Sequence, residues 1–320
     1  PNRGHWAEYQ DLMGLKRLHK RAALWSVYTP IDCGACSPEQ AFLATKYVDN
    51  CIPHIPVRTE DFEGFTLSTT DWMPYAWSTN NVAHEEVANM ALAYFQAGRS
   101  DMGFKLLKSD LTDEMLLGKS PGNFGQISFY DRERNEAYRD FGDNIGITSR
   151  AIINGLFGIS PDALNGRCII KAAFPKEWTS ASIRTPYLSY SFERKGEKDI
   201  YRIKQNFPQK LKIIVRTVVE GGEYIDSEED SHAEIEVQTC EGTFTETDNF
   251  QRIDGEVQTI VVDRKKLPSP KNYFVCDYSQ QDVYSQEYIE KMGLGKLCPD
   301  ETSEYEMLDI SELYNSNISD

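Results

Sequence analysis

The spacing of apolar residues divides the chain into a first half with a helical pattern and a second half with a strand pattern. Apolar positions three and four residues apart predict helices over residues 6–28, 37–51, 83–96, 102–108 and 145–157. From Arg167 onward, short alternating or β-branched runs predict strands at 168–171, 188–192, 200–203, 211–216 and 259–262. Strands that follow one another without intervening helices favour an antiparallel β-sandwich.

Residues that favour helix ends support several of these boundaries. Ser37 suits the N-cap of the second helix, and a proline follows it at the first helical position. Pro30 is expected to stop the first helix, and residues 78–81 offer N-cap side chains for the third. Gly98 and Gly158 are expected to end the third and the last helix. Because only a short link follows Gly98, the third and fourth helices are predicted to form an antiparallel hairpin.

The fold class that this pattern predicts is α+β, with more than one domain. We expect a helical domain over residues 1–162, a β-rich domain over 163–277 and an acidic, weakly patterned tail over 278–320. A length of 320 residues suits about two domains with sizeable hydrophobic cores.

The overall charge narrows the choice of partner. The formal net charge is −16 at pH 7, and phosphate binding needs clustered Lys and Arg, so no nucleic-acid partner is expected. The sequence holds no run of about 18 apolar residues, so no membrane insertion is expected. Charged residues at 26% and hydrophobic residues at 40% are ordinary for a globular protein.

The seven cysteines are an odd number and are too sparse for a disulfide scaffold. Cys33 and Cys36, followed by Cys51 and His54, copy the spacing of a four-ligand zinc site. The alternative, which we adopt, is that Cys36 and Cys51 flank a helix as small buried hydrophobic residues. No metal and no cofactor is predicted, and the Gly-Lys-Ser at 118–120 lacks the earlier glycine of a phosphate loop.

The densest chemistry in the sequence lies in Thr69–Glu86, at the start of the third helix. This stretch holds two Trp, a Tyr, two Asn, a His and three carboxylates. A pyranose ring has apolar faces and a rim of hydroxyls, so aromatic side chains beside carboxylates and amides suit sugar binding. The stretch therefore predicts an enzyme that acts on carbohydrates.

Several motifs carry a resemblance to a known family: Gly4–Tyr9, Trp77–Glu86, Ser120–Phe124, Tyr138–Asp143, Gly155–Asp162 and Phe174–Trp178. They resemble the later half of a bacterial six-hairpin glycosidase-type (α/α)6 toroid and its exit into a β-sandwich. The nearest family is one of large bacterial proteins of polysaccharide breakdown, distantly similar to α-L-rhamnosidases.

The resemblance implies a partial helical toroid followed by an antiparallel β-sandwich, with upstream sequence supplying the rest of the toroid. It also implies a glycoside hydrolase, or the C-terminal part of one, that uses two carboxylic residues, usually with inversion. The implied partner is a poly- or oligosaccharide substrate, and the implied location is periplasmic or extracellular. Because a helical pattern is already under way at the chain start, we expect a fragment of a longer protein.

Inverting hydrolysis needs a general acid and a general base about 6.5–9.5 Å apart, which leaves room for a water. The candidates are carboxylates in loops and first turns near predicted helix starts: Asp71, Glu85, Glu86, Asp140, Asp143 and Glu8. Neighbouring helical residues point about 100° apart, so Glu85 and Glu86 are not expected to share one role.

Each candidate carboxylate also has a structural interpretation. The two glutamates at 85 and 86 suit the first turn of a helix, where the dipole favours negative charge. Asp71 suits a turn, and Asp143 suits an N-cap. A charge pair with Arg139 would favour the ionised form of Asp140.

Sugar contacts are expected from aromatic, amide, imidazole and guanidinium side chains near these carboxylates: Trp72, Tyr75, Trp77, Asn80, Asn81, His84 and Arg139. Core packing is the alternative for the aromatic residues. For His84, which has no metal ligand four residues away, the alternative is a structural role.

Two other functions fit the same residues. A polysaccharide lyase of the toroid type abstracts a proton beside a carboxylate, and Asn80, His84, Tyr75 and Arg139 are the residue types that it uses. A non-catalytic glycan-binding module would bind oligosaccharides without cleaving them.

Overall fold

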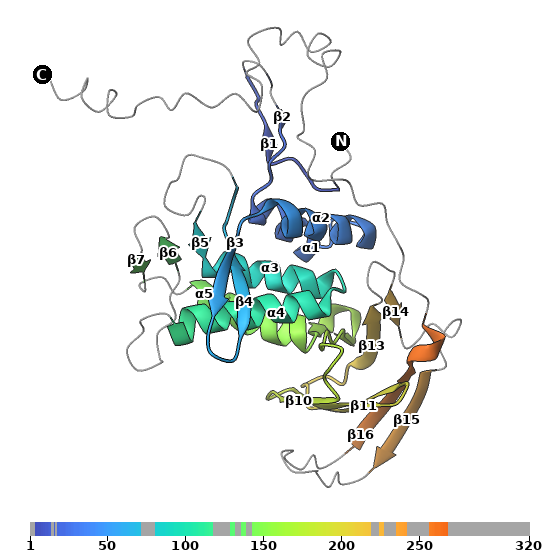
Figure 1. The fold of residues 1–320 in the computed structure, drawn as a ribbon. Helices are drawn as coiled ribbons and strands as arrows, with labels where there is room; N and C mark the ends of the chain where they lie inside the picture. Colours follow the sequence, from blue (N-terminus) through green and yellow to red (C-terminus); the bar gives the residue numbers. More distant parts are fainter. Residues whose placement is uncertain are drawn as a thin grey trace, which may run out of the picture. The chain divides into compact units, whose positions relative to one another are not determined.

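The computed structural model describes residues 4–13, 16, 18–71, 81–117, 129–131, 136–138, 143–218, 224–226, 235–241 and 256–267. The chain divides into two compact units, one of residues 1–9 with 19–276 and one of residues 10–18 with 277–320. Within the first unit, helices dominate the N-terminal half of the chain and mostly antiparallel sheets the C-terminal half (Figure 1). This confirms the predicted α+β class.

The described residues form five α-helices: α1 (Leu24–Asp32), α2 (Pro38–Cys51), α3 (His84–Gln96), α4 (Ser100–Leu111) and α5 (Asp143–Arg150). Two π-helical segments extend α4 and α5, namely η1 (Thr112–Leu117) and η3 (Ala151–Leu156). Short 3₁₀ turns are η4 (Ala163–Asn165) and η5 (Arg264–Lys266). Among these helices, none combines the length and the apolar character that a membrane span requires.

The first predicted helix is wrong over most of its length. Residues 6–23 contain two short paired strands, β1 (Tyr9–Gln10) and β2 (Leu18–His19), and α1 begins only after them. The apolar periodicity there is not a buried stripe, because Leu12 and Met13 are 92% and 84% exposed. Helical spacing without burial of the apolar face provides little stabilisation for a helix.

The predicted helix ends on either side of the link from α1 to α2 have opposite outcomes. Pro30 lies inside α1, because a proline so near the C-terminal end removes only one helical donor. Ser37 is the N-cap of α2, as predicted, and its side chain accepts a hydrogen bond of 3.2 Å from the Gln40 N–H. The Gln40 side chain accepts one of 2.9 Å from the Ser37 N–H, which completes a capping box.

α3 and α4 form the antiparallel hairpin that the sequence predicts (Figure 1). The start of α3 lies beside the end of α4, where His84 contacts Asp110. Near the other end, a Cβ on Gly103 of α4 would lie 2.8 Å from the Phe95 ring of α3. The close approach of the two helices therefore depends on glycine at this position.

α3 begins differently from the prediction. The strand β5 (Val82–Ala83) precedes it and pairs with β6 (Phe129–Asp131), which pairs in turn with β7 (Glu136–Tyr138). Ala83 is the N-cap residue of α3, and its side chain offers no capping acceptor, so Asn81 is not the N-cap residue that the sequence predicted. Gly98, with φ of +76°, follows the end of α3 as predicted.

α3 packs against both α1 and α5. Their C-terminal residues meet at Asp32, which shows that the three helices run in the same direction. Tyr28 in α1 donates a hydrogen bond to Glu86 in the first turn of α3. At the opposite end, Asp32 of α1 accepts hydrogen bonds from Gln96 of α3 and from Arg150 of α5. The N-terminal ends of the three helices therefore lie at one end of the bundle.

The five-stranded sheet is antiparallel, with the order β10-β11-β12-β16-β15. Its strands are β10 (Ser180–Arg184), β11 (Leu188–Lys195), β12 (Lys198–Gln205), β15 (Ile235–Glu241) and β16 (Glu256–Asp263). Buried side chains alternate along β11 and β12, and the register sets Tyr190 opposite Ile203 and Phe192 opposite Tyr201. This alternation confirms the strands predicted in this region.

The four-stranded sheet has the order β14-β13-β9-β8. Its strands are β8 (Ile159–Asp162), β9 (Arg167–Ile170), β13 (Lys212–Val218) and β14 (Tyr224–Asp226). β13 and β9 pair in parallel, whereas the other two pairs are antiparallel, so the C-terminal half is not purely antiparallel. A separate hairpin of β3 (His54–Arg58) and β4 (Glu63–Leu67) follows α2 and packs on α4.

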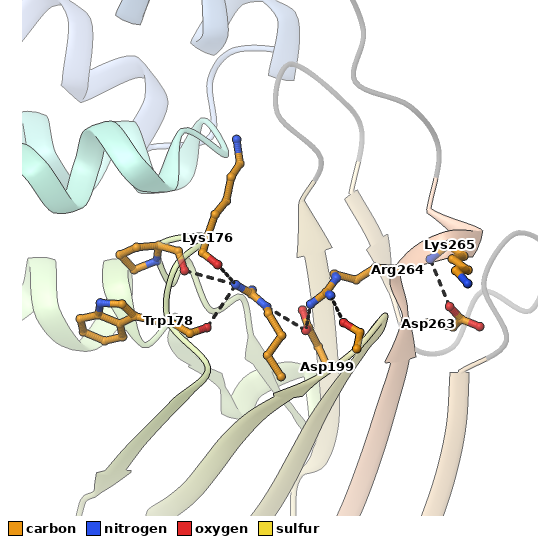
Figure 2. Close-up of polar contacts among 9 residues, drawn as sticks. Lys176, Trp178, Asp199, Asp263, Arg264 and Lys265 are labelled. Atoms are coloured by element: carbon orange, nitrogen blue, oxygen red, sulfur yellow. Dashed lines mark hydrogen bonds and ion pairs between the residues drawn. The ribbon is translucent and has the colours of Figure 1, made fainter.

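Arg194 on β11 attaches the five-stranded sheet to the loop at residues 175–178, in which Figure 2 labels Lys176 and Trp178. Its guanidinium donates hydrogen bonds to three backbone carbonyls of this loop and to the carboxylate of Asp199. Trp178 in the same loop packs edge-on against Phe104 of α4, with ring centroids 4.9 Å apart. The loop therefore connects the helices to the sheet.

Candidate functional site

Asp71 lies where the N-terminal ends of α1 and α3 meet. Two residues earlier, the Thr69 carbonyl accepts a hydrogen bond of 2.9 Å from Leu24, and the Thr69 N–H donates one of 2.7 Å to Asn81. The backbone ahead of Asp71 thus connects the start of α1 to the residues that lead into α3. Asp71 is half-buried, and its carboxylate lies 3.9 Å from Nε of Arg21.

Glu86 receives a hydrogen bond from a tyrosine on the neighbouring helix. The Tyr28 hydroxyl donates to the Glu86 carboxylate, and both residues are half-buried. Burial raises the pKa of Tyr28 far above its ordinary value, and the charges of Glu86 and Glu85 raise it further. Because the hydroxyl stays protonated, it serves Glu86 as a donor and favours the ionised carboxylate.

Glu8 has a structural task at the start of α1. Its carboxylate accepts hydrogen bonds from the N–H of Ala23 at 2.8 Å, from the indole of Trp25 at 2.6 Å and from the hydroxyl of Ser26 at 2.7 Å. Ala23, the N-cap residue, offers no side-chain acceptor, so Glu8 caps the helix from outside. We assign Glu8 to the fold rather than to the reaction that the sequence predicted for it.

His84, the first residue of α3, lies in a buried cluster of titratable side chains. Its Nδ1 lies 2.6 Å from Oδ1 of Asp110, and its Nε2 lies 3.9 Å from Oδ2 of Asp113. Glu114 belongs to the same cluster and accepts a hydrogen bond of 2.9 Å from Nδ2 of Asn144 on α5. The cluster therefore joins α3, the end of α4 with η1, and α5 inside the protein.

The members of this cluster shift one another's pKa values. Burial alone would lower the pKa of His84, but the hydrogen bond and charge of Asp110, with the charges of Glu114 and Asp113, raise it to about 8. Burial raises the pKa of Asp110 and of Asp113, and the charge of His84 opposes both changes. Burial and the charge of Asp110 raise the pKa of Glu114 to about 8.

Asp110, Asp113 and Glu114 were missing from the predicted site, although the sequence contained a signal for them. They stand three and four positions apart at the end of an amphipathic helix, a spacing that places side chains on one face. Carboxylates at this spacing are usually solvated, so the signal gains meaning only from their burial. The ligand-type neighbours of His84 lie at the end of another helix, so the residues four positions along its own helix do not indicate them.

The remaining predicted residues fall into two groups. Trp72, Tyr75, Trp77, Asn80, Arg139 and Asp140 lie outside the described residues. Asp143 is the first residue of α5, at the same end of the bundle as Asp71 and Glu86. Asn81 and His84 are 0% and 1% exposed, which places them beneath the surface rather than on it.

The cysteine pattern does not form one group of ligands. Cys33 and Cys36 precede α2, whereas Cys51 ends it and His54 follows it. A helix of 14 residues is about 21 Å long, so it holds the two pairs apart. Cys33 is exposed, and Cys36 and Cys51 are half-buried rather than buried as predicted.

Neither a known protein family nor a curated protein sequence matches this chain. The side chains at the N-terminal ends of α1, α3 and α5 are therefore the basis for inferring a function. Fold alone does not determine function, since one architecture supports many kinds of site.

Proposed function

We propose that the protein is a glycoside hydrolase, or the C-terminal part of one, that cleaves a poly- or oligosaccharide with inversion at the anomeric carbon. Asp71 is the general acid and Glu86 is the general base. The observation that carries the proposal is the position of both carboxylates, each half-buried, at the end of the bundle where α1 and α3 begin.

Glu86 suits the role of the base because two features favour its ionised form. Tyr28 donates a hydrogen bond to it, and it lies in the first turn of α3, where the helix dipole favours negative charge. As base it accepts a proton from the attacking water. Asp71, on the loop before α3, gives its proton to the leaving oxygen by a direct hydrogen bond. In inverting enzymes the two carboxyl groups stand about 6.5–9.5 Å apart, which leaves room for the water.

The arrangement of the helices supports the architecture that this activity implies. In an (α/α)6 toroid, parallel inner helices surround a cleft, and outer helices return the chain between them. α1, α3 and α5 run in the same direction, and α2 and α4 are the connecting helices between them. We assign these to part of a toroid, whose remaining helices upstream sequence supplies.

The contacts between the sheets support a β-sandwich after the toroid. A cavity of about 200 Å³ is lined by Ile203 and Gln258 of the five-stranded sheet and by Ile213 of the four-stranded sheet. Side chains from both sheets thus face the same space, as the inner faces of a sandwich do.

The test is the release of reducing sugar from a panel of plant and host glycans by the complete protein and by Asp71→Asn and Glu86→Gln. Loss of the acid or the base is expected to lower kcat by about 10²–10⁴-fold. Glu39→Gln is the matched control, because Glu39 is an exposed first-turn carboxylate of α2. Turnover at the wild-type level in both site variants would remove Asp71 and Glu86 from the mechanism.

The chemistry of the product separates this proposal from the other functions that fit the sequence. Proton NMR of the first product is expected to show the anomer opposite to that of the substrate. An unsaturated uronate, detected by its ultraviolet absorbance, would indicate a lyase instead. Saturable oligosaccharide binding without any cleavage would indicate a glycan-binding module.

A further inference from the structure

The buried cluster at the start of α3 has the composition of a metal centre. We infer that His84, Asp110 and Glu114 bind one divalent transition-metal ion, with Zn²⁺ as the species that fits best. This inference does not depend on the proposed hydrolase activity, because the cluster is buried and Glu86 is not among its ligands.

The geometry brings three ligand atoms together from separate segments. One nitrogen of His84 and one carboxylate oxygen each from Asp110 and Glu114 lie within 4.8 Å of one another. His84 opens α3, Asp110 lies in the last turn of α4, and Glu114 lies in η1. All three residues are buried, with exposures of 1%, 0% and 0%, so an ion there would be shielded from bulk water.

A second observation points to a ligand at this position. Oδ2 of Asp110 is fully buried and has no hydrogen-bond partner among the residues that the structure describes, while Oδ1 is in contact with His84. A buried carboxylate oxygen without a partner is costly, and native proteins rarely keep one. A cation bound through both oxygens of Asp110 satisfies Oδ2, which the hydrogen bond between Oδ1 and His84 does not.

The donor atoms select the kind of ion. One imidazole nitrogen with carboxylate oxygens suits Zn²⁺ or another transition metal, whereas Mg²⁺ and Ca²⁺ prefer oxygen ligands alone. Zn²⁺ binds nitrogen and oxygen at about 2.0–2.2 Å, so tetrahedral ligand atoms lie roughly 3.3 Å apart. The 2.6 Å contact of His84 with Asp110 must widen slightly as the ion takes the place of the shared proton.

The fourth ligand position is left to water. Oδ2 of Asp113 lies 3.9 Å from Nε2 of His84, the ring nitrogen that is not in contact with Asp110, so Asp113 is not counted among the ligands. A water can complete the tetrahedral shell. Asn144, which donates to Glu114, holds one of the ligands in place from α5, as outer partners of metal ligands commonly do.

A bound ion would hold three helices of the fold together. The ion would connect the first residue of α3 to the end of α4 and, through Glu114 and Asn144, to α5. The first residue of α3, His84, directly precedes Glu85 and Glu86. The expected role is therefore structural, and it predicts that the metal stabilises the protein against unfolding.

The experiment uses the untagged protein, because a histidine tag would bind Zn²⁺ itself. After chelator treatment and dialysis, the protein is titrated with Zn²⁺, and its metal content and thermal midpoint are measured. We expect about one equivalent of tightly bound Zn²⁺ and a rise in the midpoint, with no such rise for Mg²⁺ or Ca²⁺. Less than about one tenth of an equivalent with an unchanged midpoint would overturn the inference.

Variants of the proposed ligands test whether the ion binds at the cluster. Glu114→Gln and Asp110→Asn keep the side-chain shape and are each expected to weaken Zn²⁺ binding by at least about tenfold. Glu60→Gln, an exposed carboxylate, is the control that leaves binding unchanged. Cys33→Ser with Cys36→Ser is also expected to leave it unchanged, so binding lost in that double variant would assign the metal to the cysteines. Circular dichroism confirms that each variant is folded, and the wild-type titration decides the question even if one is not.

Discussion

The carboxylate of Asp49 on α2 accepts hydrogen bonds from both terminal nitrogens of Arg99, at 3.2 Å and 2.6 Å. Arg99 is the N-cap residue of α4 and only 5% exposed, and its guanidinium lies over the ring of Tyr94. The Tyr94 hydroxyl donates to the same Asp49 carboxylate at 2.7 Å. One acidic side chain thus attaches α2 to the turn of the α3–α4 hairpin.

Asp49→Ala is expected to lower the free energy of unfolding by about 3 kcal/mol, because it leaves the buried Arg99 charge and the Tyr94 hydroxyl without this acceptor. Glu63→Ala is the matched control, since it breaks the pair with Arg58 in which both side chains are mostly exposed. That change should cost less than about 1 kcal/mol. Urea unfolding of both variants measures the difference, and equal costs would show that burial of Arg99 adds nothing.

Two glycines with the same backbone conformation are expected to lose very different amounts of stability when replaced by alanine. Gly158 and Gly166 have φ of +68° and +66°, so alanine at either one is strained by about 1–2 kcal/mol. A Cβ at Gly158 would also lie 2.0 Å from the Lys171 carbonyl oxygen, whereas at Gly166 it would meet nothing within 4 Å. Because the clash is with backbone, Gly158→Ala is expected to cost at least about 3 kcal/mol in total.

Thermal or urea unfolding of Gly158→Ala and Gly166→Ala tests this comparison. The positive φ is shared, so the difference between the variants isolates the contact with Lys171. Similar losses of stability in the two would mean that the chain near residue 171 shifts away at little cost.

Local signals explain which parts of the fold were predictable. The capping box of Ser37 and Gln40 and the glycine at 98 act within a few residues, so sequence alone places these helix ends. The helix predicted over 6–28 failed because its start is decided by Glu8, which reaches from fifteen residues away to cap Ala23. Strand β8 was missed because a proline interrupts its pattern at Pro161.

The candidate site, like the fold, has some residues with a local sequence signal and others without one. Sequence pattern predicts Asp71 and Glu86 as site residues, because they lie within one dense stretch next to a helix start. It did not identify Tyr28 or Asp110, which join the site and the cluster only through packing of α1 and α4 on α3. Contacts between distant segments carry no local signal, so a single sequence does not reveal them.

The pH dependence of stability should contain a contribution from Asp32. Burial alone would raise the pKa of this carboxyl, but hydrogen bonds from Arg150 and Gln96, with the charge of Arg150, outweigh it and lower the pKa. A lowered folded-state pKa means that the contribution is fully present above the unfolded value of about 3.9. It is lost as the pH falls through the folded value.

Asp32→Asn is therefore expected to be less stable than the wild type at pH 7. The expected loss is about 1 kcal/mol, because Arg150, the ion-pair partner of Asp32, is exposed. The difference should shrink as the pH falls from about 4 towards 2, where the wild-type carboxyl is also neutral. Urea midpoints at a series of pH values check both parts. A difference that stays constant with pH would assign the loss to packing rather than to charge.

Tyr28→Phe tests whether the hydrogen bond to Glu86 matters for the reaction as well as for the fold, and it rests on the proposed function. The variant removes one donor from the proposed base and keeps the ring. Because the ionised carboxylate loses this support, the acidic limb of the kcat/KM profile is expected to move to higher pH. We expect kcat to fall about tenfold, with little change in KM.

Tyr9→Phe is the control for this variant, because Tyr9 is 54% exposed. Among the described residues, no contact joins Tyr9 to Glu86. Steady-state kinetics across the pH range, together with the thermal midpoint, separates the two roles of Tyr28. A lower midpoint with an unmoved pH profile would confine Tyr28 to holding α1 against α3. A moved profile at an unchanged midpoint would make Tyr28 a positioning residue for the base, and would identify the gap between these two helix starts as the place where water is activated.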